Sequence, residues 1–573
     1  MARTLALILA VGLSMLAPSW SSAQVITFGA PGVGPMQGMP QRDTTTPKTG
    51  TARIRGRITA ADTGQPLRKA QVRVVSPETR ENHLTSTDAE GKYELKDLPA
   101  GRYQINVSKG SFVSLQYGQS RPFEAGKPLQ IADGQVVEKV DFALPRGAVI
   151  TGHVVDEFGE PIADIRVAPM RYQFVQGRRQ LNAAGRVATT NDIGEYRIFG
   201  LAPGQYYLSA STQGNLLAVG LDQTTTDDRS GYAPSYYPGT PNVAEAQRIT
   251  VGLGQMLSDM NLALTPTRLA RISGTVSDAD GKPMGGAVLV VMMRSGASIS
   301  STSGTQVKPD GTFTVSNLAP GDYMLQAVTP SMLTDLSQMA SGQVTVAGED
   351  ITGVQLTAVR STAGTGRVVV NGDAKSVPPT SIKLMATPAH PEQNLMAGIG
   401  GVNVKDDYTF ELKARPGLAL IRAMSLPPGW SLKSVKQRGS DVTDTGIEFR
   451  PNEELSGIEV ELTNQTTEVS GAVTNNRSEP VKDYTVVVFA KDRERWGYMS
   501  RFFGTGRPDQ DGRFKVRSLP AGEYYAVALD YVEPGEASDP ELLDRVKTGA
   551  VSFSLSDGET KTIDLKISSS ASH

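Results

Sequence analysis

The chain has 573 residues, which is enough for several domains. Its 57 basic and 59 acidic side chains leave a net charge of −2, so it has no basic field to attract nucleic acid, and we exclude a nucleic-acid partner. The sequence contains no cysteine, which excludes disulfides, thiol catalysis and a lipid-modified N-terminal cysteine.

The N-terminal segment predicts export. Arg3 precedes an apolar stretch over residues 5–16 and small residues at 21–23, the pattern of a secretory signal peptide. This stretch is too short for a membrane span and no later segment reaches ~20 apolar residues, so we expect no transmembrane span in the mature chain. Exported eukaryotic sandwich domains often carry disulfides, so the lack of cysteine favours a bacterial protein that is periplasmic, outer-membrane-associated or extracellular.

A hairpin pattern occurs four times along the chain, beginning at Asp88, Asp192, Asp310 and Asp511. In each copy a glycine lies eight residues after the first aromatic residue, and a tyrosine follows two residues later. Apolar and polar residues alternate on both sides of a turn that contains proline and glycine. Since proline and glycine interrupt every run that a helix would need, the pattern predicts a β-hairpin.

A second repeated element precedes each hairpin. It begins with a strand that contains a glycine, continues through a polar turn and a proline, and ends in another strand. The strand glycines are Gly56, Gly152, Gly274 and Gly471. A closing alternating strand follows each hairpin, as at residues 140–144. About seven short strands in roughly a hundred residues are typical of a small antiparallel sandwich.

Residues 363–467 carry a weaker form of the same pattern. Asp407 and Phe410 precede Pro416 and Gly417, and an alternating strand at 458–462 closes the segment. We count it as a fifth, diverged copy. A spacing near one hundred residues is too long for solenoid repeats and normal for an autonomous domain. The predicted fold is therefore all-β, with tandem antiparallel β-sandwich domains arranged as beads on a string.

These patterns divide the chain into successive segments. The predicted segments are a signal peptide (1–23), a disordered leader rich in Gly, Pro, Thr and Gln (24–50), unit 1 (51–145), unit 2 with a Tyr-rich insertion (146–268), unit 3 (269–362), the diverged unit 4 (363–467), unit 5 (468–568) and a tail (569–573).

The paired elements resemble the carboxypeptidase regulatory-like domain. The resemblance is carried most clearly by Gly274, Val276, Gly281 and Pro283, followed by the hairpin from Asp310 to Tyr323. It covers four units clearly and unit 4 weakly. It implies a transthyretin-like (prealbumin-like) sandwich and a carbohydrate-binding-like role. It implies no activity, because the resemblance extends to the accessory domain of the peptidases and not to the enzyme, and one fold hosts many functions.

The residues that a zinc peptidase requires are missing from the pattern. A catalytic zinc ion needs about three ligands, typically two histidines and a carboxylate. The histidines His83, His153, His390 and His573 have no such spacing. The sequence also lacks a Gly-x-Ser-x-Gly elbow and a phosphate-binding loop. We therefore predict that the chain is not an enzyme and that it has no catalytic residues, no metal site and no cofactor.

Two acidic segments resemble fragments of calcium loops. They begin at Asp278 and Asp509, and each has a second aspartate and a glycine. Neither has the distal bidentate glutamate that a full loop needs. Aspartate and glycine are also common turn residues, and we interpret both segments as turns.

The insertion of unit 2 contains the candidate binding residues Tyr232, Tyr236 and Tyr237. Long insertions on rigid sandwiches often bind ligands, and the neighbouring prolines stiffen this one. The three tyrosines would form an aromatic platform for sugar rings or a peptide. The alternative is that they pack the insertion against the sheet. Trp496, Tyr498, Phe502 and Phe503 form a weaker signal of the same kind, and we interpret Trp430 as a packing residue.

The sequence thus predicts a non-enzymatic exported binding or spacer protein of the bacterial envelope, with carbohydrate or an envelope protein as its partner. Such binding would also serve adhesion. The alternative from another class is an accessory subunit of a separate envelope hydrolase or transporter. A carboxypeptidase is a remote third alternative that rests only on the name of the family.

Overall fold

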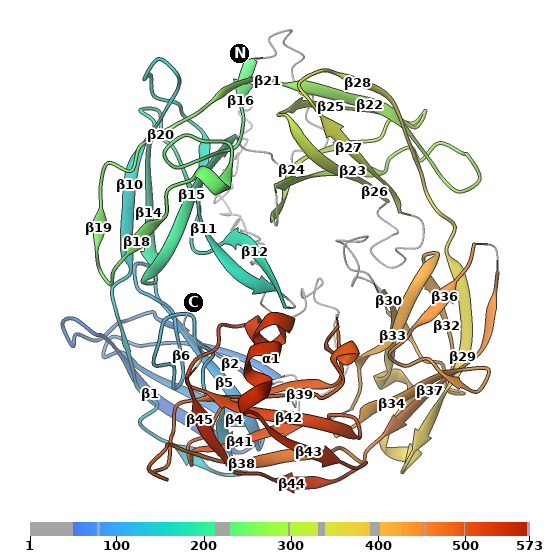
Figure 1. The fold of residues 1–573 in the computed structure, drawn as a ribbon. Helices are drawn as coiled ribbons and strands as arrows, with labels where there is room; N and C mark the ends of the chain where they lie inside the picture. Colours follow the sequence, from blue (N-terminus) through green and yellow to red (C-terminus); the bar gives the residue numbers. More distant parts are fainter. Residues whose placement is uncertain are drawn as a thin grey trace, which may run out of the picture.

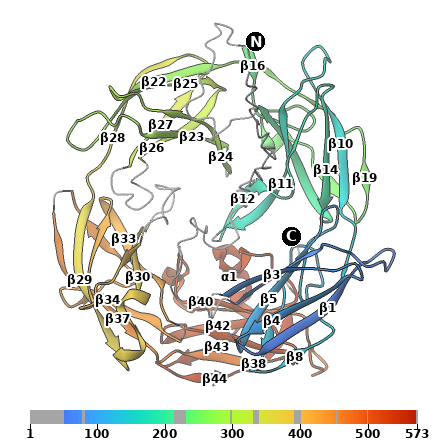
Figure 2. The same cartoon turned by 180° about the vertical axis from the view of Figure 1, so that it is seen from behind.

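The structure is a computed structural model that describes residues 50–569, except 77–80, 176, 213–229, 296–297, 330–338, 390–400, 428, 452 and 498. Within these residues the chain forms five β-sandwich units arranged in a ring (Figure 1). The first and last units lie side by side, as the view from behind also shows (Figure 2). The predicted signal peptide, nearly all of the leader and residues 570–573 of the tail lie outside the described residues.

Among the described residues, the first three units consist of strands and one short 3-10 helix. The strands of unit 1 are β1 (Ala52–Ala60), β2 (Gln71–Ser76), β3 (Glu81–Ser86), β4 (Lys92–Leu98), β5 (Gly101–Ser108), β6 (Leu115–Gln116), β7 (Leu129–Ile131), β8 (Val136–Val137) and β9 (Phe142–Leu144). Those of unit 2 are β10 (Ala148–Val155), β11 (Ile165–Val175), β12 (Arg178–Ala183), β13 (Ala188–Thr189), β14 (Glu195–Leu201), β15 (Gly204–Thr212), β16 (Ser230–Tyr232), β17 (Ser235–Tyr236), β18 (Ile249–Val251), β19 (Met256–Leu257), β20 (Leu262–Ala263) and β21 (Pro266–Arg268), with helix η1 (Val243–Glu245). Those of unit 3 are β22 (Ala270–Ser277), β23 (Val288–Ser295), β24 (Ser298–Gln306), β25 (Thr312–Leu318), β26 (Gly321–Val328), β27 (Ala340–Val346) and β28 (Ile351–Thr357).

The last two units add short helices. The elements of unit 4 are β29 (Thr362–Asn371), η4 (Ala374–Ser376), η5 (Pro379–Ser381), β30 (Lys383–Pro388), β31 (Val402–Asn403), β32 (Thr409–Ala414), β33 (Gly417–Ser425), β34 (Ser431–Gln437), β35 (Ser440–Asp441), β36 (Ile447–Phe449) and β37 (Leu455–Thr463). Those of unit 5 are β38 (Glu468–Thr474), β39 (Thr485–Ala490), η7 (Arg493–Trp496), β40 (Phe503–Gly506), β41 (Arg513–Arg517), β42 (Gly522–Leu529), η8 (Glu536–Ser538), α1 (Pro540–Val546), η9 (Lys547–Gly549), β43 (Val551–Leu555), β44 (Thr560–Thr562) and β45 (Leu565–Ser568).

The sheets repeat one topology. In unit 1, β1 pairs with β4 in one sheet, and β2 pairs with β3 and β5 in the other. The closing strands β8 and β9 return beside β1 in parallel, and the closing strand of every other unit does the same with its first strand. The prediction of tandem β-sandwiches is thus confirmed, with parallel pairing of the closing strands added to the otherwise antiparallel sheets.

Each unit buries its own core. The five clusters of buried apolar side chains fall one to a unit, as expected when alternating strands bury one face internally. Unit 5 extends its core with helix α1, whose Leu542 and Leu543 are buried in the same cluster. The predicted boundaries between units stay a prediction, and the ring adds contacts between units that are distant in sequence.

A glycine in the first strand lets the closing strand approach closely. A Cβ atom added to Gly56 would lie 1.9 Å from the carbonyl oxygen of Val140. In the diverged unit 4, a Cβ on Gly366 would lie 2.1 Å from the carbonyl oxygen of Ile458. Real Cβ atoms do not approach that closely, so the position accepts no side chain. Unit 4 therefore keeps the same close strand contact although its hairpin pattern has diverged.

The repeated tyrosine fastens the hairpin turn to the following strand. Its hydroxyl donates to the carbonyl oxygen four residues earlier in all four copies, as in the tyrosine corners of other sandwiches. The pairs are Tyr103 with Pro99 (2.7 Å), Tyr206 with Ala202 (2.8 Å), Tyr323 with Ala319 (2.7 Å) and Tyr524 with Pro520 (2.6 Å). Burial raises the pKa of Tyr206 to about 12, so its hydroxyl remains a donor at neutral pH. Unit 4 has Ala419 at this position and lacks the bond.

Replacing Tyr524 by phenylalanine should destabilise unit 5 by about 1–2 kcal/mol, because the partly buried carbonyl oxygen of Pro520 loses its donor. Urea denaturation of the mature chain, followed by Trp496 fluorescence in a Trp430→Phe background, would measure this. The neighbouring Tyr525→Phe is the control, since no hydrogen bond is found for that hydroxyl among the described residues. Equal losses in both variants would contradict a fastening role for Tyr524.

Candidate functional site

The tyrosines of the unit 2 insertion lie against the sandwich. Tyr236 is in β17, pairs with Ser209 of β15 and is only 5% exposed. Tyr237 donates its backbone N–H to the Leu208 carbonyl, and its own carbonyl accepts from Gln247. The side chains of Tyr232 and Tyr237 pack against the core of unit 2 but stay partly exposed. Tyr236 is thus a packing residue, and Tyr232 and Tyr237 keep surface for a ligand; whether they bind one stays a prediction.

Tyr232 has an acidic neighbourhood. Partial burial, and after it the nearby carboxylates of Glu157 and Asp156, raise the pKa of Tyr232. Glu157 lies in the turn that connects β10 and β11, so this turn and the insertion border each other. The remainder of the insertion, residues 213–229, lies outside the described residues.

The other described aromatic residues singled out from the sequence are packing residues. The indole N–H of Trp496 donates to the Ala490 carbonyl at 2.7 Å, and its ring packs edge-on against Phe489. Phe502 is buried and stacks on Tyr524. Trp430 packs against the core of unit 4, as predicted. Tyr498 lies outside the described residues.

The polar residues considered for chemistry take structural positions. His83 lies in β3 and His153 in β10, in different units, while His390 and His573 lie outside the described residues. No group of three or more potential metal ligands occurs within the part of the chain that the structure describes. Asp278 accepts the backbone N–H groups of Asp280 and Lys282, so its carboxylate organises a turn, and Asp509 does the same in unit 5.

The contact that closes the ring is a buried ion pair between units 1 and 5. Arg507, after β40, donates to Glu124 at 2.9 Å, to the Tyr484 carbonyl at 2.9 Å and to Asp483 at 3.0 Å. The side chains of Arg507 and Glu124 are 7% and 1% exposed. Glu124 also accepts from Ser120. Two buried charges remain stable only when their geometry and hydrogen bonds are nearly complete, which fixes how the two units meet.

Further polar contacts surround this pair. Lys127 of unit 1 lies 3.3 Å from Asp483 and donates to the Lys482 carbonyl at 2.6 Å. Burial alone would raise the pKa of Asp483, but the Ser120 hydrogen bond and the charges of Lys127 and Arg507 hold it below its usual range. Gln510 exchanges two hydrogen bonds with the backbone of Gln130.

The same loop of unit 1, residues 117–127, also contacts unit 2. Phe123 packs against the core of unit 2, and the guanidinium of Arg171 lies 3.8 Å from the centre of its ring. Arg171 in turn pairs with Glu533 of unit 5. The loop therefore lies where three units meet, and we call these contacts the three-unit junction. The repeated patterns gave no sign of it, because Glu124 and Arg507 lie between the repeated positions.

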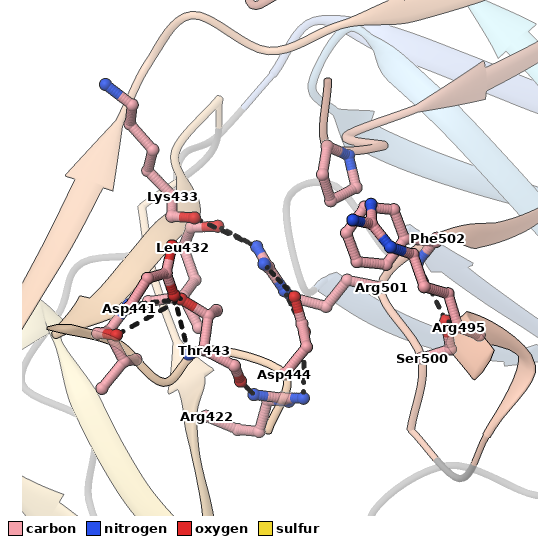
Figure 3. Close-up of polar contacts among 12 residues, drawn as sticks. Arg422, Leu432, Lys433, Asp441, Thr443, Asp444, Arg495, Ser500, Arg501 and Phe502 are labelled. Carbon is pink, nitrogen blue, oxygen red and sulfur yellow. Dashed lines mark hydrogen bonds and ion pairs between the residues drawn. The ribbon is translucent and has the colours of Figure 1, made fainter. Parts of the chain in front are cut away.

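A second ionic contact joins units 4 and 5 (Figure 3). Arg501 forms a two-pronged pair with Asp444, at 3.0 and 2.8 Å, and donates to the carbonyl oxygens of Leu432 and Lys433. Arg422 approaches Asp444 from unit 4 at 3.5 Å and donates to the Thr443 carbonyl. Burial lowers the pKa of Arg422. Neighbouring units are thus held by specific side chains as well as by the connecting chain.

Comparisons with known proteins give similarities of low identity. A streptococcal ancillary pilin is 13% identical over 54% of this chain and 98% of the pilin, with a TM-score of 0.19. GBS52, the minor pilin of Streptococcus agalactiae, is 16% identical over 37% of this chain and 96% of its own, with a TM-score of 0.18. A 3-chlorocatechol 1,2-dioxygenase from Rhodococcus opacus 1CP covers 19% of this chain and 64% of its own at 15% identity, with a TM-score of 0.13. TM-scores this low carry no argument about function.

No curated protein matches the chain. In the described residues, no helix has both the length and the apolar character that crossing a membrane requires. The sequence model of the carboxypeptidase regulatory-like domain matches residues 53–145 and 271–359. These segments contain the repeated glycine, hairpin and tyrosine on which the resemblance was based. Units 1 and 3 are therefore the parts of the chain that are similar to the carboxypeptidase regulatory-like domain.

Proposed function

We propose that this chain is an exported, non-enzymatic binding protein of the bacterial envelope, in which five sandwiches form a closed scaffold. The observation that carries the proposal is the three-unit junction. Its buried Arg507–Glu124 pair and the Phe123 contact hold units 1, 2 and 5 in one arrangement. A chain that served only as an extended spacer would gain nothing from joining its ends. A closed scaffold holds its surface loops at fixed separations, which lowers the entropy lost when they bind.

The ligand class proposed for the insertion of unit 2 is carbohydrate. Tyr232 and Tyr237 each offer part of an aromatic face and a hydroxyl, and Tyr236 anchors the segment between them in the sheet. Tyrosine faces suit sugar rings, because the apolar side of the ring stacks while hydroxyls hydrogen-bond at its edge. The Glu157 carboxylate beside Tyr232 adds an acceptor for sugar hydroxyls.

Replacing Tyr232 and Tyr237 together by alanine should weaken glycan binding by more than about tenfold, or ~1.4 kcal/mol. The measurement is binding of the purified mature chain to an array of glycans and cell-wall fragments, with thermal unfolding recorded in parallel. Tyr207→Ala, a half-buried tyrosine that packs on Tyr172 in the same unit, is the matched control and should bind normally. If the double variant binds glycans as the parent does, the tyrosines only pack the insertion, and the carbohydrate proposal fails.

A further inference from the structure

Unit 2 differs from the other units at two exposed turns. Asp156 follows β10, and its side chain accepts the backbone N–H groups of Phe158 and Glu160, at 2.9 and 2.8 Å. Asn191, before β14, accepts those of Ile193 and Glu195, at 3.3 and 2.8 Å. The same bonds form around Asp278 in unit 3 and around Asn475 and Asp509 in unit 5. The turns are therefore equivalent in structure and can be compared residue by residue.

The comparison isolates Phe158 and Ile193. In the first turn, Phe158 immediately precedes the residue with a left-handed backbone. The position of Phe158 is occupied by Thr63, Asp280 and Arg477 in units 1, 3 and 5. Ile193 holds the same place in the second turn, where the others have Glu90, Asp310 and Asp511. Phe158 is 83% exposed and Ile193 52% exposed. Since polar residues make the same turns, folding does not require these apolar side chains, and we call the pair the apolar tip.

The two turns lie at the same end of unit 2. β10 pairs with β14, with His153 opposite Glu195, and Val154 donates its N–H to the Gly194 carbonyl at 2.9 Å. A Cβ added to Gly194 would lie 2.9 Å from the Cβ of Pro161, which follows the first turn. The two residues of the apolar tip thus stand in neighbouring turns at one end of the unit. Exposed apolar groups that gather in this way mark interaction sites.

Carboxylates surround the apolar tip. Glu157, Glu160 and Asp192 are exposed, and none of them has an ion pair with another described residue. In units 1 and 3 the corresponding first turn pairs with an arginine in the segment that leads to the first strand of the next unit. The pairs are Asp62 with Arg146 and Asp280 with Arg360. The acidic groups of unit 2 are therefore free to meet cations of a partner, apart from the contact of Glu157 with Tyr232.

We propose that the apolar tip is a docking surface for a basic segment of another protein that presents large apolar side chains. Covering Phe158 and Ile193 removes apolar surface from water, and the carboxylates select for lysine or arginine beside the apolar contacts. A turn of this kind already makes a contact between units in this chain. Gln510 lies in the turn of unit 5 that is equivalent to Asn191–Glu195, and its side chain forms hydrogen bonds with the backbone of Gln130 in unit 1. The proposal goes beyond carbohydrate binding by the tyrosines and does not depend on it.

The test uses the full mature chain and three fluorescent peptides, read by anisotropy. One peptide alternates lysine with leucine and phenylalanine, the second keeps the lysines but replaces its apolar residues by serine, and the third replaces its lysines by glutamate. We expect only the first to bind. Phe158→Ser with Ile193→Ser should weaken it by about tenfold or more. Glu157→Gln with Glu160→Gln and Asp192→Asn should weaken it to a similar extent.

Leu253→Ser is the matched control, because Leu253 is 58% exposed in the same unit but lies beside the start of β10, at the opposite end. That variant should bind the first peptide as the parent does. Equal binding of the lysine–serine peptide, an equal loss in Leu253→Ser, or no binding at all would overturn the proposal. The proposal would also be overturned if the double variant Phe158→Ser with Ile193→Ser abolished binding of glycans, or binding of a second copy of the chain. If the Tyr232 and Tyr237 double variant loses glycan binding but still binds the first peptide, the carbohydrate and docking sites are separate and the docking proposal holds.

Discussion

Replacing Arg507 by leucine is expected to open the ring between its first and last units. The change leaves Glu124 without its cation at a position where its side chain is 1% exposed. Removing one partner of a buried ion pair costs about 3–5 kcal/mol, and opening of the ring relieves this cost because Glu124 returns to water. Small-angle scattering of the mature chain should then show a larger radius of gyration, and the loop at 117–127 should become sensitive to proteases.

Two further variants separate ring opening from general destabilisation. Leucine at both Arg507 and Glu124 removes the stranded charge, so this double variant should remain more closed than Arg507→Leu alone. Arg367→Leu breaks an exposed ion pair with Glu459 in unit 4 and should leave the radius unchanged. An unchanged radius in Arg507→Leu would show that the buried pair does not hold the ring closed.

Replacing Gly471 by alanine is expected to unfold unit 5. A Cβ at this position would lie 1.8 Å from the Ile563 carbonyl oxygen and 3.1 Å from the Phe514 ring. Relief of that overlap requires the closing segment to move away from β38, which breaks the parallel pairing of β38 with β44 and β45. The loss should exceed about 4 kcal/mol, which is rare for the addition of one methyl group. Trp496 fluorescence during urea denaturation reports on this unit.

The control for this prediction is Gly497→Ala in the same unit. A Cβ on Gly497 meets nothing within 4 Å, and the residue has a φ of −67°, so alanine should be tolerated. If Gly471→Ala and Gly497→Ala have the same stability, the close strand approach is not what excludes a side chain from the repeated position.

The sequence was sufficient for the fold within a unit, because the features that define it are local or repeated. The alternation of apolar residues, the glycine of the turn and the tyrosine two residues later lie within one hairpin, and four copies reveal which positions matter. The weaker repeat pattern of unit 4 also has a local cause. Ala419 replaces the tyrosine there, while Gly366 keeps the strand contact.

The arrangement of the units could not be predicted in the same way. Glu124 and Arg507 are 383 residues apart and are ordinary charged residues in unrepeated segments, so no periodicity links them. In the insertion of unit 2 the strands β16 and β17 are too short to show an alternation, and the sequence could not tell the buried Tyr236 from its partly exposed neighbours. The apolar tip did leave a signal, since Phe158 stands in a turn where the other copies have polar residues.

The separation of Glu124 and Arg507 along the chain also sets an order of events during synthesis. At about 5–20 residues per second, Arg507 leaves the ribosome tens of seconds after Glu124. Unit 1 can complete its own core in that interval, and Glu124 stays a solvated anion until unit 5 is made. Closure is therefore the last step of assembly. A chain that stops before unit 5 would leave this loop uncovered on its side toward unit 5, where proteases that remove incomplete products can reach it.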